Sequence, residues 1–461
     1  MRTKRHRKAR VAAVAAFSIA STVCAGTAGS SVSAISPHRD VTVAKSTPRR
    51  YSQHPRPVSA PVASAASTAA VKARMPEQVL RQTLASDRSA QIDSNNRLYF
   101  ADPAPELPSF VGVRGVTVAD STDAFMLHSF PAATRKIFLD FTGNTAVVPG
   151  WNNGAPIVSA PLDLDGTPTS FSLAERAFVT TVWRTVAEDF APWQVDVTTQ
   201  DPGLESLRMT APDDNAYGIR VVLSPTSWRG KAYSGISFNG SFDWDSDTPN
   251  YVFTEMTGSD AKFTGDIASH EVGHTLGLLH DGQGTNPYYE GSNGWAPIMG
   301  NPGYQGLTQW SKGEYAGANN SQDDIATIDS FIPRRQDETG STPLTAKPIA
   351  APTALDGVLS SRSDSDSYKV TLPSGRWLFS ATPTLDSAAD TNLSLNVYNA
   401  SGARIARSNP RGTTPPAKTL ILPAGTFYVR VDSVGEGLPA AGGYSDYASL
   451  GFYRLTVKMV P

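Results

Sequence analysis

The sequence predicts an α/β (α+β) domain built on a twisted mixed sheet, followed by a small all-β sandwich. Residues 131–335 mix β-prone stretches with amphipathic helical patterns, and residues 336–352 form a polar, proline-rich linker. From residue 353 to 461 the apolar residues alternate with a period of two, as in short strands. With 461 residues, the chain is long enough for several domains with cores of their own.

In the first domain, "KIFLDF" at 136–141 predicts a strand. Ser172 and Glu175 form a capping box, and the apolar spacing that follows predicts a long helix to Phe190, which Pro192 stops. Further elements are expected as strands at 195–199, 219–224, 234–240 and 250–255, and as a later helix at about 322–332.

The sandwich is predicted from five alternating segments with glycine and proline turns between them. They read "DSYKVTL", "GRWLFSA", "NLSLNVYNA", "TLILPAGTFYVRVDS" and "GFYRLTVKMV".

Residues 1–34 have the pattern of a secretory signal peptide. Six basic side chains lie between residues 2 and 10, an apolar run follows at 11–25, and Val32-Ser33-Ala34 offers a small-residue cleavage site. The alternative, a basic nucleic-acid-binding arm, leaves the apolar run unexplained. Cys24, the only cysteine, lies in this segment. We therefore expect a secreted, extracellular protein without disulfides.

Residues 35–130 are expected to be a pro-segment, with a flexible spacer as the alternative. Residues 35 to about 75 are rich in Ser, Pro, Ala, Thr and Arg without apolar periodicity, which predicts disorder. The remainder, which includes "NNRLYFADPAPELP", is expected to be more structured.

The charge is unevenly distributed along the chain. The formal net charge is −2, and removal of the six N-terminal basic residues would leave −8. Because residues 35–130 carry 11 basic and 8 acidic side chains, residues 131–461 are near −11. This acidic body argues against nucleic acid as a partner. No stretch reaches the roughly 20 apolar residues of a membrane span, so we expect a monomer without stable membrane insertion.

The segment "HEVGHTLGLLHDG", residues 270–282, holds three of the seven histidines. On a helix, His270 and His274 lie on one face and can converge on one point. Gly277 lets the chain leave the helix, and a bend there brings His280 back. Three neutral nitrogen donors with one open position are the ligand set of a catalytic zinc site. Two surface histidines are the alternative for HExxH alone, but the full pattern arises by chance on the order of a few times per million such chains.

The same residues match the HExxHxxGxxH motif of the metzincin metallopeptidases, and Asp281 resembles the adamalysin/reprolysin-like members. The resemblance covers residues 134–335 and implies a zinc ion bound by His270, His274 and His280. It also implies a methionine beneath the metal, for which Met299 in "WAPIMG" is the candidate; an ordinary core methionine is the alternative. Residues 353–461 are similar to bacterial pre-peptidase C-terminal domains through "DSDSYKVTL" and "GTFYVRV".

The chain departs from the family in two places. Some metzincins carry a tyrosine two residues after the methionine, where this chain has Asn301, and the nearest tyrosine is Tyr304. Some relatives are inhibited by a pro-segment cysteine, which is impossible here because Cys24 leaves with the signal peptide. A carboxylate is the substitute, and Asp102 in "YFADP" is the candidate.

We therefore expect a zinc metalloendopeptidase made as a zymogen, acting on protein or peptide substrates. Zinc would lower the pKa of a water molecule towards about 7. Glu271 would accept its proton as the water attacks the peptide carbonyl. Asp281 is expected to fix the turn behind His280, with a solvated aspartate as the alternative. An exported binding or adhesion protein with a structural or degenerate metal site is the second hypothesis, and hydrolysis of a non-peptide bond is the third.

Two further sites are weaker. Gly235 and Ser237 in "SGISFNG" lie on the strand expected to pair with an extended substrate, with an ordinary sheet edge as the alternative. Calcium is a second candidate cation, at Asp243, Asp245 and Asp247 or at "DLDGT", 163–167; both also fit solvated acidic loops.

Overall fold

The structure, a computed structural model, describes residues 63–104, 123–230, 232–303, 305–384 and 389–461. The expected signal peptide with Cys24 lies outside the described residues, and so does Tyr304. Within the described ranges, no helix is long and apolar enough to cross a bilayer.

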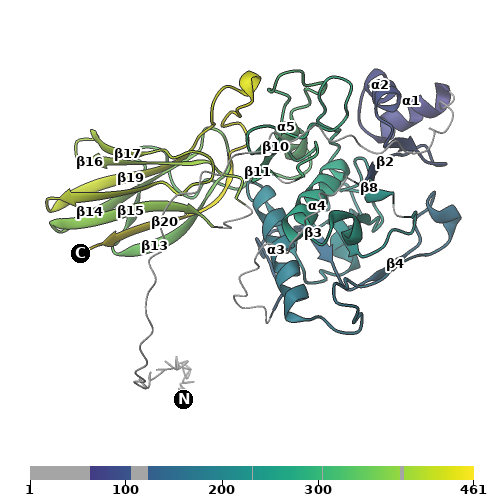
Figure 1. The fold of residues 1–461 in the computed structure, drawn as a ribbon, viewed down its shortest axis with the longest axis horizontal. Helices are drawn as coiled ribbons and strands as arrows, with labels where there is room; N and C mark the ends of the chain where they lie inside the picture. Colours follow the sequence, from purple (N-terminus) through teal and green to yellow (C-terminus); the bar gives the residue numbers. More distant parts are fainter. Residues whose placement is uncertain (1–62, 105–122, 231, 304, 385–388) are drawn as a thin grey trace, which may run out of the picture. The chain divides into compact units, whose positions relative to one another are not determined.

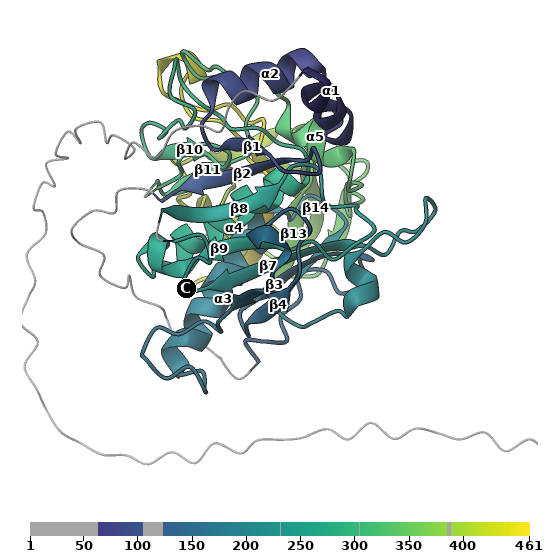
Figure 2. The same cartoon turned by 90° about the vertical axis from the view of Figure 1, so that its right-hand side faces the viewer.

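A seven-stranded mixed sheet organises the first domain, and its strands follow one another across the face seen in Figure 2. Their order is β1 (Ala90–Ile92), β2 (Leu98–Pro103), β8 (Tyr233–Phe238), β9 (Asn250–Phe253), β7 (Gly218–Ser224), β3 (Arg135–Asp140) and β6 (Val195–Thr198). β9, β7, β3 and β6 are parallel, whereas β8, β2 and β1 are each antiparallel to their neighbours. All five strands predicted for this domain are confirmed. Residues 90–103, within the stretch expected to be a pro-segment, add β1 and β2 at the edge of the sheet.

Two helices, α3 (Leu173–Asp189) and α4 (Ala261–Thr275), pack on one face of this sheet and on each other (Figure 1). The predicted capping box is present: Ser172 accepts from the Glu175 amide, and Glu175 accepts from the Ser172 amide at 2.7 Å. On β7, Val221 faces these helices while Val222 packs on the opposite face, as strand alternation requires. The opposite face is covered by the hairpin of β4 (Asn144–Ala146) and β5 (Ile157–Ser159) and the chain between them.

Three short elements follow α4 in the first domain. β10 (Trp295–Pro297) and β11 (Leu307–Gln309) form a parallel pair, and α5 (Asp324–Asp329) is capped by the Asp323 side chain. The predicted helix at 322–332 is thus confirmed in kind, with a shorter length.

The expectation of disorder to about residue 75 is wrong for its last part. α1 (Ala63–Lys72) and α2 (Glu77–Ser86) are helices, and Ala69, Ala70 and Leu80 pack against Phe100 of β2. The sequence of α1 has no large apolar stripe, so periodicity missed it. Alanine has the highest helix propensity, and its small side chain is enough where a partner strand lies close.

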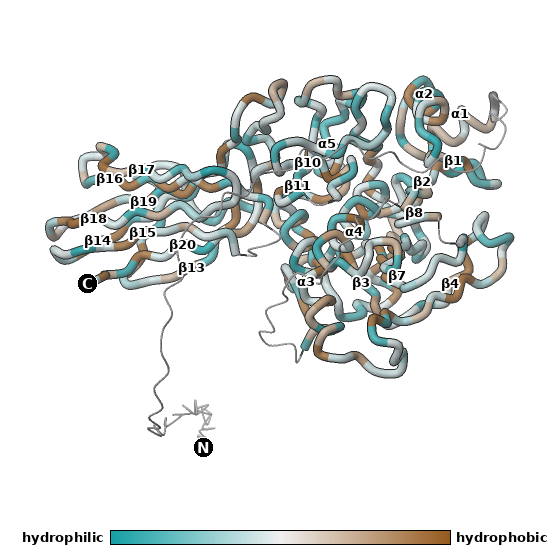
Figure 3. The backbone as a smooth tube through the Cα atoms, viewed as in Figure 1, coloured by the Kyte–Doolittle hydropathy of each residue, from teal (hydrophilic) through white to brown (hydrophobic). Residues whose placement is uncertain are grey.

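The C-terminal residues form the predicted sandwich of two sheets. One has the order β12 (Lys347–Ile349), β14 (Ser365–Leu372), β19 (Gly425–Ser433), β16 (Leu393–Asn399) and β17 (Arg404–Ser408). The other has the order β13 (Thr353–Leu359), β20 (Gly451–Met459), β15 (Gly375–Pro383) and β18 (Ala417–Leu422). Hydrophobic and hydrophilic positions alternate along these strands (Figure 3). β12 lies inside the stretch expected to be a linker and pairs with β14.

The sandwich contributes to the core of the first domain. Tyr447, Ala448 and Leu450 belong to the cluster around α3 and α4. The Tyr447 hydroxyl accepts a 3.0 Å hydrogen bond from the Ile325 amide at the start of α5. This contact is apolar and specific, unlike the flexible tether suggested by the proline-rich sequence.

Candidate metal centre

The three histidines of the motif converge as predicted. His270 and His274 lie on α4, which ends at Thr275. Gly277 has a φ of +87°, a left-handed conformation that glycine adopts without strain, and the Leu278 amide donates to the Gly273 carbonyl at 3.0 Å. The chain then turns back, so that His280 Nε2 lies 3.0 Å from His274 Nε2 and 3.1 Å from His270 Nε2.

The outer nitrogen of each imidazole has a hydrogen-bond acceptor of its own. Nδ1 of His270 donates to the Ile298 carbonyl at 2.8 Å, and Nδ1 of His274 donates to the Leu278 carbonyl at 2.9 Å. His280 Nδ1 lies 2.5 Å from a carboxylate oxygen of Asp87. These contacts hold the proton on Nδ1 and leave the Nε2 lone pairs directed at one point, as in metal-binding histidines.

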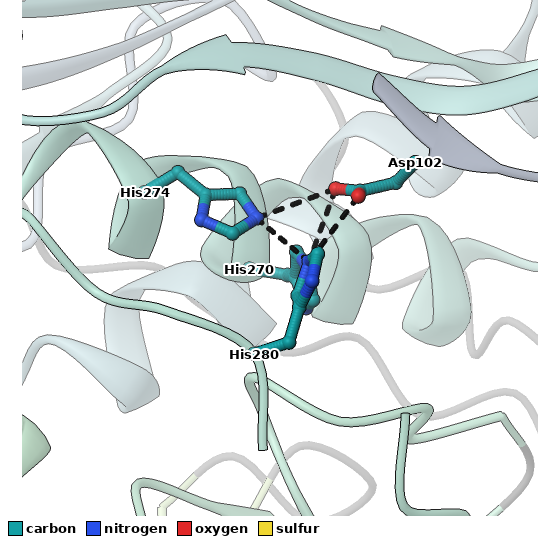
Figure 4. A group of neighbouring side chains, drawn as sticks. All are labelled: Asp102, His270, His274 and His280. Carbon is teal, nitrogen blue, oxygen red and sulfur yellow. Dashed lines mark hydrogen bonds and ion pairs between the residues drawn. The ribbon is translucent and has the colours of Figure 1, made fainter. Parts of the chain in front are cut away.

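Asp102 of β2 occupies the fourth corner of this cluster (Figure 4). Its Oδ2 lies 3.3 Å from His270 Nε2 and 3.4 Å from His274 Nε2, and its Oδ1 lies 3.2 Å from His280 Nε2. The Tyr288 hydroxyl donates to Oδ1 at 2.8 Å, whereas Oδ2 is buried without a hydrogen-bond partner. The aspartate expected from "YFADP" is therefore brought to the three histidines by the fold.

The four groups fit a bound cation. A tetrahedral ion with metal–nitrogen bonds of 2.0–2.1 Å places its donor atoms about 3.3 Å apart, close to the separations given above. Lone pairs of three imidazoles and a carboxylate face one another, which is unfavourable unless a positive charge lies between them. The surroundings of His280 also favour a positive charge. Burial alone would lower the pKa of His280, but the carboxylates of Asp87 and Asp102 raise it to about 10. Burial instead lowers the pKa of His274 to about 4.

Glu271 lies beside the cluster and is fully buried. Its Oε2 accepts a 2.5 Å hydrogen bond from the Ser237 hydroxyl of β8. A Cβ atom on Gly235 would lie 1.8 Å from Oε1, so this position of the strand has to be glycine for Glu271 to fit. Burial and the charge of Asp102 raise the pKa of Glu271 well above its ordinary value, which increases its strength as a base.

Met299 and Asp281 lie behind the cluster. A Cβ atom on Gly273 would meet the Met299 sulfur at 2.5 Å, so this methionine packs directly against α4 between the two helical histidines. Asp281 is buried, and burial raises its pKa to about 7; the solvated alternative is wrong. Its amide donates to the Met299 carbonyl at 2.8 Å, which ties the loop after His280 to the methionine.

Three site residues have no signal in the sequence. Asp87 and Phe100 come from the expected pro-segment, and the Phe100 ring stacks on His274 at a centroid distance of 4.1 Å. Tyr288 lies in the loop after the motif, with its ring 4.3 Å from that of His280. Long-range pairing brings Asp87 and Phe100 here, since Asp87 is 193 positions from His280. Tyr288 is near His280 in the sequence, but its hydroxyl contact with Asp102 spans 186 positions.

The two calcium candidates, 243–247 and 163–167, differ in whether their carboxylates come together. Asp243 pairs with Arg74, and Asp247 pairs with Arg220, so "DWDSD" does not converge on one point.

Within the part of the chain that the structure describes, carboxylates come together in two other groups: Asp163, Asp165 and Glu175 form one, and Asp337, Asp364 and Asp366 form the other. In the first group, Glu175 is already occupied by the Leu164 amide and the Ser172 amide and hydroxyl. The second group was not singled out in the sequence.

Comparisons with known proteins add little. No protein-family model and no curated protein matches the chain. Among solved structures, the pre-peptidase C-terminal domain of a Bacillus anthracis collagenase is 18% identical over 27% of this chain and 98% of its own, with a TM-score of 0.20. The lysozyme inhibitor PliG of Aeromonas hydrophila is 16% identical over 25% of this chain and all of its own length, with a TM-score of 0.17. These similarities are too weak to bear on function, and the metzincin resemblance stays a prediction from the motif.

Proposed function

We propose that the chain is a secreted zinc metalloendopeptidase of the metzincin type, made as a zymogen. The observation that carries the proposal is the convergence of three Nε2 atoms, each with its Nδ1 engaged, beside a buried glutamate. Three imidazoles leave one position for reactants, which distinguishes a catalytic zinc site from a closed structural one. The signal-like N-terminus supports export.

Zinc, when bound by His270, His274 and His280, supplies Lewis-acid activation of water and of a peptide carbonyl. Glu271 accepts the proton of the attacking water and passes it to the leaving amine. Ser237 holds the Glu271 carboxylate in place.

Tyr288 directs its hydroxyl to the position now taken by Asp102 Oδ1. There the hydroxyl can donate a hydrogen bond to the oxyanion of the tetrahedral intermediate.

Asp102 is the residue that keeps the zymogen inactive. Its carboxylate takes the one position that the histidines leave for reactants, and β2 is held there by antiparallel pairing with β8, Asp102 opposite Gly235. Phe100 covers His274 from the same strand. Removal of the pro-segment frees both the fourth position and the edge of β8.

An extended peptide is the substrate that fits this edge. β8 is the strand on which Gly235 and Ser237 were expected to pair with substrate, and β2 already pairs with it as an added strand. A small ester or amide would leave this edge unused, so the endopeptidase proposal accounts for more of the site than hydrolysis of a non-peptide bond.

The test is metal content and peptide cleavage, measured on the same preparations of the processed enzyme. Glu271→Ala should keep about one equivalent of zinc and lose roughly 10²–10⁴-fold of its cleavage rate. His274→Ala should lose both, because one ligand of three is gone. Glu205→Ala, at an exposed glutamate of the same domain, is the matched control and should resemble the parent.

Equal cleavage by the parent and Glu271→Ala would contradict the mechanism. An exported binding protein predicts no peptide cleavage by any of these preparations, with partner binding retained by Glu271→Ala.

A further inference from the structure

We propose that the face of β8 turned away from α4 carries a subsite for an aromatic side chain of the substrate, occupied in the precursor by Tyr99. The inference rests on the proposed peptidase function and adds the kind of residue that the cleft selects. It starts from the alternation of side chains along β2. Phe100 and Asp102 face the histidines, so Tyr99 and Ala101 point to the opposite face of the sheet.

The Tyr99 ring lies against a preformed pair of aromatic rings. Trp151 and Phe238 stack on each other with centroids 4.2 Å apart and an interplanar angle of 10°. Tyr99 presents its edge to both: its centroid is 5.8 Å from Trp151 at 67° and 5.9 Å from Phe238 at 70°. Edge-to-face packing of this kind is the favoured arrangement of aromatic pairs.

A polar group lies at the end of the same ring. The Arg229 guanidinium is 5.6 Å from the centroid of the Tyr99 ring, and its NH1 donates to the Tyr99 hydroxyl at 3.4 Å. The hydroxyl itself donates to Gln91 at 2.6 Å. Arg229 therefore offers a cation–π contact to any aromatic ring and a donor to a phenolic oxygen.

The subsite remains when the pro-segment leaves. Trp151, Arg229 and Phe238 all belong to the domain of residues 131–335, whereas Tyr99 and Gln91 belong to the pro-segment. Trp151 and Phe238 are now only 2% and 1% exposed. Arg97 of the pro-segment also covers Phe238, with its guanidinium 4.2 Å from the ring centroid. Release of β2 uncovers these rings beside the edge of β8, and apolar surface uncovered beside a polar site is typical of a ligand-binding cleft.

The occupant is a peptide strand that pairs with β8 in the antiparallel direction of β2. In that register, Tyr99 lies opposite Phe238 and Asp102 lies opposite Gly235. One substrate residue takes the place of Asp102 next to the histidines. The aromatic residue that the subsite selects lies three positions before it, on the N-terminal side of the scissile bond.

The first experiment walks one tyrosine through the positions N-terminal to the cleavage site of an otherwise alanine-rich peptide. The enzyme is the processed form obtained from the full-length secreted precursor. We expect kcat/KM to peak at a single position, with tyrosine at least roughly tenfold above alanine there. Phenylalanine should be slightly below tyrosine because it lacks the hydroxyl, and leucine should be well below both.

Variants assign that preference to the subsite. Trp151→Leu should reduce the tyrosine-to-alanine ratio, and Trp183→Leu, at a partly buried tryptophan of α3, should leave the ratio unchanged. A synthetic peptide of residues 96–104 should inhibit the processed enzyme, and the same peptide with Tyr99→Ala should inhibit at least roughly tenfold less. In the full-length precursor, Tyr99→Ala should speed activation.

The outcomes separate the two proposals. Cleavage of peptides without an aromatic preference at any of these positions, or an unchanged ratio in a folded Trp151→Leu enzyme, overturns the subsite and leaves the peptidase function intact. Equal inhibition by the two synthetic peptides also overturns the subsite. Failure to cleave any peptide with zinc bound overturns the peptidase function itself.

Discussion

The Ser237 hydroxyl on β8 donates a 2.5 Å hydrogen bond to Glu271 on α4, so the strand expected to bind substrate also holds the proposed base. This bond lowers the pKa of Glu271 against the opposite effect of burial. In the processed enzyme, Ser237→Ala should reduce kcat roughly tenfold, since a bond to a charged group is lost, with KM and zinc content unchanged. Because the pKa of Glu271 rises, the acidic limb of the kcat profile should move to higher pH. Ser234→Ala, on the same strand, is the control; an unmoved limb in Ser237→Ala would refute this role.

Asp102 should determine the latency of the precursor. Asp102→Ala removes the carboxylate from the histidines, so the full-length precursor should cleave peptides before processing or should mature faster. Asp102→Asn keeps the shape but loses the charge, and should fall between the parent and Asp102→Ala. Activity is measured on secreted precursor, with Glu77→Gln, at a partly exposed residue of α2, as the control. Identical activation of Asp102→Ala and the parent would mean that the precursor is kept inactive by the steric blockage of β2 and not by the Asp102 carboxylate.

Asp87 should tighten metal binding in the precursor. It contacts Nδ1 of His280 at 2.5 Å, and loss of such an outer carboxylate typically weakens metal affinity 10–100-fold. Asp87→Asn precursor should therefore release zinc to a chelator about tenfold faster than the parent, and the processed enzyme, which lacks Asp87, should do the same. Arg88→Gln, at the neighbouring residue, serves as the control. A release rate equal to that of the parent would show that His280 does not need this partner.

Tyr288 should act in catalysis as well as in latency. Tyr288→Phe removes the hydroxyl that now bonds Asp102 and leaves the ring on His280. In the processed enzyme, kcat should fall about tenfold or more while zinc content stays constant, because one donor to the oxyanion is lost. Tyr289→Phe is the matched control, since its ring stacks on Tyr315 at 4.2 Å, away from the histidines. Equal kcat for both variants would exclude Tyr288 from the mechanism.

The junction between α3 and the sandwich should make stability fall as pH rises. Burial raises the pKa of Asp189 to about 7 and raises the pKa values of Asp390 and Glu188 well above their ordinary values. The charge of Asp189 raises the pKa values of both neighbours further. The cationic Lys262 faces Asp189 and Asp390, and it pairs with Asp266 at 2.8 Å.

The sign follows from linkage. A carboxyl whose pKa is raised by folding contributes stability that is complete below its unfolded value of 3.8 and is lost as pH rises through its folded value, here about 7 for Asp189. We therefore expect the Tm to fall between pH 5 and pH 8. Asp390→Asn should flatten this dependence, whereas Asp356→Asn, at an exposed ion pair, should not. A Tm that rises over this range would contradict the assignment.

Local patterns determined much of this molecule. The capping box at Ser172, the strands of the sheet and the bend at Gly277 depend on neighbouring residues, and each is where the sequence predicts it. The same is true of the three converging histidines, because helical spacing and one glycine are enough to bring them together.

Only the tertiary structure decided what surrounds those histidines. Asp102 was a candidate on chemical grounds, but its contact with all three nitrogens depends on β2 adding to the edge of β8. Asp87, Phe100 and Tyr288 could not be found, because their roles come from pairings over long stretches of chain that leave no periodic trace. The helix α1 was missed for a related reason: its alanines are buried only because β2 supplies the other side of that small core. Sequence spacing thus determined the convergence of the histidines, whereas strand pairing determined which groups cover and orient them.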